Sequence, residues 1–172
     1  PQAGGIAPGN GTLVSAVHTA VGRMPQVAGK PETPIFTAAL ERVGARSAIM
    51  VGDRLDTDIR GANRAGIPSV LVLTGIDRAR SALTATPEER PTHVVDDLHE
   101  LHAEYPQTRE TFERSTGATY AEVGRAAVRR LGGDVTLVRA GEGADTLRAA
   151  LHLVATADRG PAALRIDPAL LA

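Results

Sequence analysis

Three short apolar runs, separated by segments of helical periodicity, constrain the fold of this chain more than any other feature. The runs SAIMVGD (47–53), SVLVLTG (69–75) and THVVDD (92–97) have the length of buried strands, and QVAGK (26–30) is a weaker fourth candidate. Strands that alternate with helices along a chain are typical of a parallel sheet covered by helices. The sequence therefore predicts an α/β fold with a Rossmann-like parallel sheet.

Helix start and stop signals lie between these runs. The segment 33–44 begins with Thr-Pro, which suits an N-cap and a first helical position, and it ends in glycine. We predict a second helix over 57–66, capped by Thr57, and a third from Asn10, as its cap, to about Val21. The apolar residues of this third helix that should face inward are Leu13, Val14, Val17, Ala20 and Val21.

The second part of the chain differs from the first. Residues 103–117 are polar and have no clear period, as expected for a linker. Two β-like runs then flank residues 131–134, whose glycines have the spacing of a hairpin turn. We therefore predict two domains, a core at 1–106 and a small appended α+β module at 107–172.

The appended module gives no sign of chemistry. His152 is isolated in the sequence, and Arg129-Arg130 is predicted to lie at a solvated strand edge. A closing amphipathic helix is indicated by Leu147, Ala150, Leu151 and Val154. The sequence assigns no role to this module.

Composition excludes several classes of function. The net charge is −1 and the arginines are scattered without interleaved aromatic residues, which argues against binding to nucleic acid or to a membrane surface. No cysteine is present, so a disulfide framework and a Cys-bearing zinc site are excluded. No apolar run approaches the roughly 18 residues of a membrane span, and no signal-peptide pattern is seen, so we expect a cytoplasmic protein.

Two aspartates follow the first strong strand at a spacing that suits a metal site. Asp53 ends the buried run, and Asp58 lies five residues later in the first turn of the next helix. Ligands of open α/β sheets bind outside the carboxyl ends of the strands, where carboxylates can hold a hard cation such as Mg²⁺. We interpret Asp56 only as a helix cap, and Asp96-Asp97 as a helix cap with solvent contact.

Lys30 is the only lysine among 19 basic residues. An ammonium is a compact point charge with three rotatable donors, whereas a guanidinium is a broad planar fork. A site that needs one small cation between phosphate oxygens and a carboxylate would not easily accept arginine. The lone lysine is therefore a candidate phosphate-binding residue, although an ordinary surface position is the alternative.

Two segments carry the resemblance of this chain to a known family: GKPETPIF and, after it, VGDRLDTDIRGANRAGIPSVLVLTG. Over about residues 6–102, the chain resembles the C-terminal half of a haloacid dehalogenase (HAD) superfamily phosphatase core. The resemblance is closest to the large-capped subfamily that includes p-nitrophenyl phosphatases, and PGNGTLVSAVHTAVGR and the appended module resemble glycerol-3-phosphate phosphatases. It implies a magnesium-dependent phosphomonoesterase that acts on a small phosphorylated metabolite, with glycerol 3-phosphate as one candidate, through an aspartyl-phosphate intermediate.

The resemblance also implies roles for individual residues. Lys30 matches the lysine that contacts the transferring phosphoryl group, Asp53 matches the acid that coordinates Mg²⁺, and Asp58 matches the second acid of the metal motif, which supports the site and the lysine. The family's DxDGT nucleophile signature does not occur in this sequence. Residues 1–10 resemble only the exit from a cap domain, so we expect this chain to need the N-terminal half of the same polypeptide and to be inactive alone.

Two other functions stay open. The chain could be a non-catalytic Rossmann-like module that binds a phosphorylated ligand or a protein partner in the same crevice. A receiver-type domain phosphorylated on Asp53 fits less well, because its lysine would be expected after the acid rather than before it. The oligomeric state is open, with a homodimer as one candidate.

Overall fold

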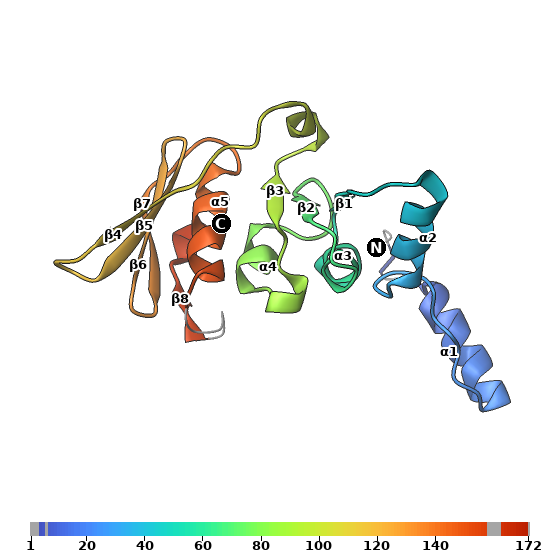
Figure 1. Cartoon of the computed structure of the whole chain (residues 1–172). Coiled ribbons are helices and arrows are strands. Elements are labelled where there is room, and N and C mark those ends of the chain that lie inside the picture. Colours follow the sequence, from blue (N-terminus) through green and yellow to red (C-terminus); the bar gives the residue numbers. More distant parts are fainter. Residues whose placement is uncertain (1–3, 6, 158–162, 172) are drawn as a thin grey trace.

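The computed structural model describes residues 4–5, 7–157 and 163–171, and it contains two sheets (Figure 1). The first sheet is parallel, with the strand order β1-β2-β3. Its strands are β1 Met50–Gly52, β2 Ser69–Val72 and β3 His93–Val95. Each strand falls within one of the three strong apolar runs, and the predicted α/β fold with a parallel sheet is confirmed.

Helices and helical turns connect these strands. In chain order they are α1 Asn10–Val21, α2 Pro34–Val43, η1 Leu55–Ile59, α3 Arg60–Arg64, α4 Ala79–Thr84, η2 Pro87–Glu89 and η3 Leu98–His102. α2 starts after Thr33 and ends at Gly44, whose left-handed φ of 62° suits glycine. The helix predicted over 57–66 is instead a π-helical turn followed by the short α3, so Thr57 lies inside the turn and does not cap it.

The second sheet has the order β4-β5-β6-β7-β8. Its strands are β4 Arg109–Glu113, β5 Ala118–Val123, β6 Ala126–Leu131, β7 Asp134–Arg139 and β8 Arg165–Ile166. All neighbours are antiparallel except β7 and β8, which run parallel on either side of α5 Asp145–Ala155 in the sequence. The last turn is η5 Pro168–Leu170. The hairpin predicted around 131–134 is present, with a left-handed Gly132.

One hydrophobic cluster joins the two sheets. α5 lies between the five-stranded sheet and the region of α4 and β3 (Figure 1). Its Leu153 is fully buried and belongs to the same cluster as Leu71 of β2, Leu83 of α4 and Val94 of β3. The four residues predicted for the apolar face of this helix, Leu147, Ala150, Leu151 and Val154, are all buried. The module therefore packs directly against the parallel sheet.

Three predictions for the N-terminal region are wrong. Residues 26–30 form an exposed loop, because no described strand lies beside them to pair with their backbone. α1 does form, but Leu13, Val17 and Val21 are 61%, 62% and 60% exposed, and the helix projects away from the rest of the chain (Figure 1). Its cap position is Gly9, so Asn10 is a helical residue and not the cap.

Three predictions for the appended module also need correction. The polar stretch 103–117 contains β4, whose side chains are almost all exposed and so show no apolar pattern. Arg129-Arg130 lies on β6, which has neighbours on both sides and is not a strand edge. His152 is not isolated, because its Nε2 lies 2.7 Å from Oε2 of Glu110 on β4.

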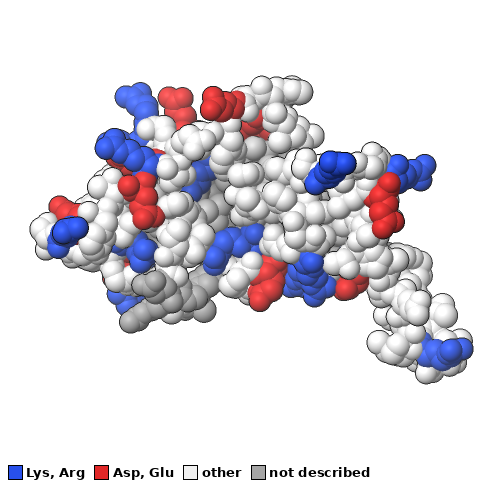
Figure 2. All heavy atoms as spheres, in the orientation of Figure 1, with Lys and Arg blue, Asp and Glu red and all other residues white. Residues whose placement is uncertain are grey.

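The surface carries charges of both signs. Figure 2 shows acidic and basic side chains interspersed over the face drawn, as the net charge of −1 leads one to expect. Among the described residues, no helix is both long and apolar enough to cross a membrane.

Candidate active site

Asp58 is the residue that holds the candidate site together. Its side chain is only 4% exposed, and one of its oxygens, Oδ1, lies 2.6 Å from the Lys30 ammonium. The other oxygen, Oδ2, accepts hydrogen bonds from the backbone N–H groups of Asp53 and Arg54, each at 3.1 Å. The structure thus brings Lys30, Asp53 and Asp58 into one hydrogen-bonded group, although 28 residues separate Lys30 from Asp58.

The chain reaches this arrangement through a tight turn after β1. The strand ends at Gly52, and η1 then carries Asp58 back beneath the strand end. A Cβ at Gly52 would lie 2.4 Å from Cβ of Asp58, closer than real carbon atoms approach. Glycine at position 52 is therefore needed for Asp58 to reach the backbone of Asp53, which is a packing requirement and not a φ requirement.

The Asp53 carboxylate is held on one side only. Its Oδ2 accepts a hydrogen bond of 3.1 Å from the Ile76 N–H, and a Cβ at Gly75 would lie 2.0 Å from Cβ of Asp53. Within the described part of the chain, Oδ1 of Asp53 has no hydrogen-bond donor. That free oxygen at the carboxyl end of a parallel strand is suited to a hard cation.

Asp77 is a site-bracing residue that the sequence reasoning missed. Its Oδ2 accepts a hydrogen bond of 2.7 Å from the Leu55 N–H, and its own N–H donates to the Asp53 carbonyl at 3.0 Å. It thereby ties the loop after β2 to the loop after β1. The available signal was its position, because Asp77 lies just after the second apolar run, as Asp58 lies shortly after the first.

The remaining acids have structural roles. Asp56 forms a two-pronged ion pair with Arg54 at 3.0 and 2.7 Å, and these hydrogen bonds lower the pKa of the Asp56 carboxyl. It was interpreted as a helix cap, but the structure shows no cap bond to it. Asp97 does cap η3, accepting a hydrogen bond of 2.7 Å from His99, as predicted.

The described residues fit a magnesium site only in part. They contain no cluster of three or more acids or histidines that could enclose a metal by itself. Asp53 offers a free oxygen, whereas both oxygens of Asp58 are already bonded to Lys30 and the backbone. Asp53 is therefore the candidate ligand, and Asp58 is placed to orient its neighbours. Any further protein ligands must come from outside this group.

Comparison with known proteins gives this geometry a context. Residues 27–101 match the family model described as HAD-hydrolase-like. A D-glycerol 3-phosphate phosphatase from Mycobacterium tuberculosis is 52% identical over 102 residues, which are 59% of this chain and 29% of that protein. A dihydroxyacetone phosphatase from Corynebacterium glutamicum is 36% identical over 103 residues, which are 59% of this chain and 37% of that protein.

Solved structures extend the match beyond the parallel sheet. A glycerol phosphate phosphatase from Mycobacterium tuberculosis, solved in complex with magnesium, superposes with a TM-score of 0.69 at 38% identity over 97% of this chain and 47% of that one. A 4-nitrophenylphosphatase from Thermotoga maritima superposes with a TM-score of 0.53 at 36% identity over 59% of this chain and 39% of that one. The chain therefore spans less than half the length of these relatives, and the first of them matches the appended module as well.

Proposed function

We propose that this chain, whose residues 27–101 match the HAD-hydrolase-like family model, supplies the lysine and the metal-binding acid of a magnesium-dependent phosphomonoesterase. The observation that supports the proposal most is the contact of 2.6 Å between Lys30 and a buried Asp58 that also binds the backbone of Asp53. This arrangement places a cation and a carboxylate at one edge of the sheet, where a phosphate and a metal ion can be bound side by side.

Each residue has a distinct part in the proposed chemistry. Lys30, 44% exposed, offsets charge on the oxygens of the transferring phosphoryl group. Asp53 holds Mg²⁺, which supplies further positive charge at those oxygens when bound. Asp58 keeps the ammonium and the Asp53 loop in a fixed relation. An aspartate nucleophile would give an aspartyl-phosphate that water then hydrolyses.

The nucleophile must come from another segment in this proposal. The printed sequence contains no Asp-x-Asp-Gly-Thr, and the relatives are more than twice as long as the part that matches. The free edge of β1 supports a missing neighbour, because β1 pairs only with β2 among the described strands. Beside it lies an apolar pocket of about 250 Å³, lined by residues that include Phe36, Leu40 and Met50. We propose that the N-terminal half of the same polypeptide covers this edge, and that the chain is inactive alone.

The proposed substrate class is taken from the relatives. We propose a small phosphorylated metabolite, with glycerol 3-phosphate as the first candidate, because the 52% identical relative is named for that substrate. Cytoplasmic location and a homodimer stay predictions.

The test is hydrolysis of glycerol 3-phosphate by the longer polypeptide that contains this chain, with and without Mg²⁺. We expect Asp53→Asn and Lys30→Arg each to lower kcat at least about 100-fold, the loss typical of one preorganised charge-stabilising group. Asp97→Asn, a change at the η3 cap, is the matched control and should leave kcat unchanged. Full activity of either site variant would remove that residue from its assigned role.

A non-catalytic phosphate-binding module is the second candidate, because the printed sequence lacks the nucleophile signature. The same experiment separates the two functions. Binding of glycerol 3-phosphate to the longer polypeptide without release of inorganic phosphate would favour the binding module and contradict the phosphatase.

A further inference from the structure

Arg90 is a partly buried cation without a partner. No carboxylate forms an ion pair with it in the described part of the chain, and its Nε atom is fully buried without a hydrogen-bond acceptor. Burial alone accounts for the lowered pKa of this guanidinium, with no acid acting in the opposite direction. A partly buried charge without a compensating acid is unfavourable, and an anion from outside the chain would stabilise it at this position.

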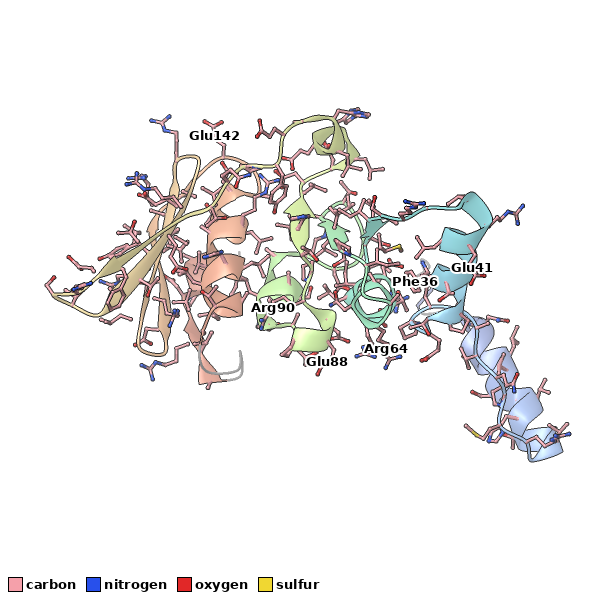
Figure 3. All side chains as sticks on the ribbon, viewed as in Figure 1. Phe36, Glu41, Arg64, Glu88, Arg90 and Glu142 are labelled. Carbon is pink, nitrogen blue, oxygen red and sulfur yellow. The ribbon has the colours of Figure 1, made fainter. Side chains whose placement is uncertain are left out.

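The backbone of Arg90 is fixed, so the charge does not simply lie on a loose loop. The Asn63 side-chain amide donates to the carbonyls of Glu88 and Arg90 at 2.9 and 3.0 Å. Figure 3 shows Arg90 between α4 and α5 in the view drawn. The residue lies just before β3.

Arg90 lines a pocket of about 170 Å³ at the junction of the two sheets. One wall comes from residues before and within β3, including Thr92 and His93, and the other comes from Thr108, Leu151 and His152 of the module. At about 30 Å³ per water molecule, the volume corresponds to roughly six waters, which suits a small metabolite and not a nucleotide or a peptide.

The other charged groups at this pocket are already paired. Arg148 donates to the Val94 carbonyl, to Asp145 at 2.9 Å and to Glu100, and its guanidinium lies 5.0 Å above the Tyr105 ring. His152 contacts Glu110. Arg90 is therefore the one arginine of the pocket, among the described residues, with charge left to offer to a ligand.

This pocket is separate from the candidate active site. Asp53 follows the carboxyl end of β1, whereas Arg90 and Thr92 precede the amino end of β3 in the same parallel sheet. Strands of a parallel sheet present these ends at opposite edges. A ligand at Arg90 would contact β3 and α5 without approaching Lys30.

We propose that the pocket binds a small organic oxyanion, a phosphate ester or a carboxylate, whose charged group pairs with Arg90 while its carbon skeleton lies against the apolar wall. The guanidinium fork suits a two-pronged contact with such a group. Since one wall comes from the β3 region and the other mainly from α5 of the module, binding stabilises the packing of α5 against β3. The proposal does not depend on the phosphatase reaction.

Calorimetric titration of the protein tests the proposal, in magnesium-free buffer at constant ionic strength. The probes are glycerol 3-phosphate and butyrate as organic oxyanions and inorganic phosphate as a charged group alone. We expect Arg90→Met to weaken the binding of the organic probes about 10- to 100-fold, the loss of one charge-assisted contact. Arg90→Lys, which keeps the charge, should retain part of the affinity.

Two further variants locate the binding. Arg23→Met removes an exposed arginine beyond α1, and Lys30→Met removes the cation of the candidate active site. Both should bind butyrate, which carries no phosphoryl group, as the parent does. The melting temperature of Arg90→Met without anions should equal or exceed that of the parent, since an uncompensated charge has been removed. Unchanged affinity in Arg90→Met or loss of butyrate binding in Lys30→Met would overturn the proposal. Inorganic phosphate binding more tightly than both organic probes, or no binding at millimolar concentrations, would overturn it as well.

Discussion

The two sheets differ in how much buried hydrophobic core surrounds each of them. The five-stranded sheet and α5 supply most of the large hydrophobic cluster, including Val123, Val128, Val135 and Leu153. On the other face of the parallel sheet, only Val70, Val72 and Val95 form a small second cluster. Phe36 is the one buried residue among those described between positions 7 and 49. The candidate site is thus carried by the less complete part of the molecule.

This difference shows what fixes the site. Lys30 is held by a hydrogen bond to Asp58 and not by a surrounding core, and β1 has a free edge. The joint with the module, where α5 packs against α4 and β3, has by contrast both apolar packing and the buried Arg148. We therefore expect substitutions at the joint to affect stability strongly, and substitutions at the N-terminal edge to affect it little in this chain.

Arg148→Met should cause the largest loss. The guanidinium is 7% exposed and binds the Val94 carbonyl, Glu100 and Asp145, all of which would lose their partner. Removing one member of a buried charge network costs about 3–5 kcal/mol. Urea unfolding of the variant and the parent measures the change in the free energy of unfolding. The control is Arg139→Met, which breaks an exposed ion pair and should cost less than about 1 kcal/mol; equal effects of the two changes would contradict the joint's importance.

Leu153→Ala against Leu13→Ala tests the comparison directly. Leu153 is 0% exposed in α5, and its truncation should lower the free energy of unfolding by about 2–5 kcal/mol. Leu13 is 61% exposed on α1, so the same truncation should change it by no more than about 0.5 kcal/mol. A large cost at Leu13 in the isolated chain would mean that α1 has found a partner surface, for instance in a second copy.

Gly52→Ala should disturb the site more than the fold. The added methyl group would overlap Asp58 at 2.4 Å, so the turn must shift, at a cost of about 1–3 kcal/mol. Gly29→Ala is the matched control next to the lysine, because nothing lies within 4 Å of its Cβ position. Crystal structures or NMR spectra of both variants would show whether the contact between Lys30 and Asp58 is lost only in the first. Its survival in Gly52→Ala would contradict the required close approach.

The strong strands and the positions of the candidate-site acids could be predicted because their signals are local. Each buried run has its own apolar pattern, and Asp53 follows one of them directly. The closing helix was equally clear, since Leu147, Ala150, Leu151 and Val154 recur at helical spacing and all are buried. Where the apolar pattern of one short segment also determined its burial, the sequence was sufficient to predict the element.

Predictions failed where the outcome depended on a distant partner. The pattern of α1 indicates an apolar face, but nothing in it reveals that no described segment covers Val17. β4 is polar because it lies at a sheet edge, so its pairing with β5 left no mark in residues 109–113. Asp77 is a bracing residue only because the turn after β1 passes beside it.

The smallest expected effect concerns the pH dependence of the joint. Burial lowers the pKa of His93, which starts β3 and whose ring centroid lies 4.5 Å from that of Tyr105. Between its lowered pKa and the ordinary value of 6.5, the unfolded chain binds a proton that the folded chain does not, so stability falls as the pH decreases through that window. His93→Gln should reduce this loss by less than about 1 kcal/mol, because the ring is only partly buried. Urea unfolding at several values between pH 5 and 8 measures the slope of the free energy of unfolding against pH. Identical slopes for the variant and the parent would show that the joint near the Arg90 pocket is open to water and not closed by α5.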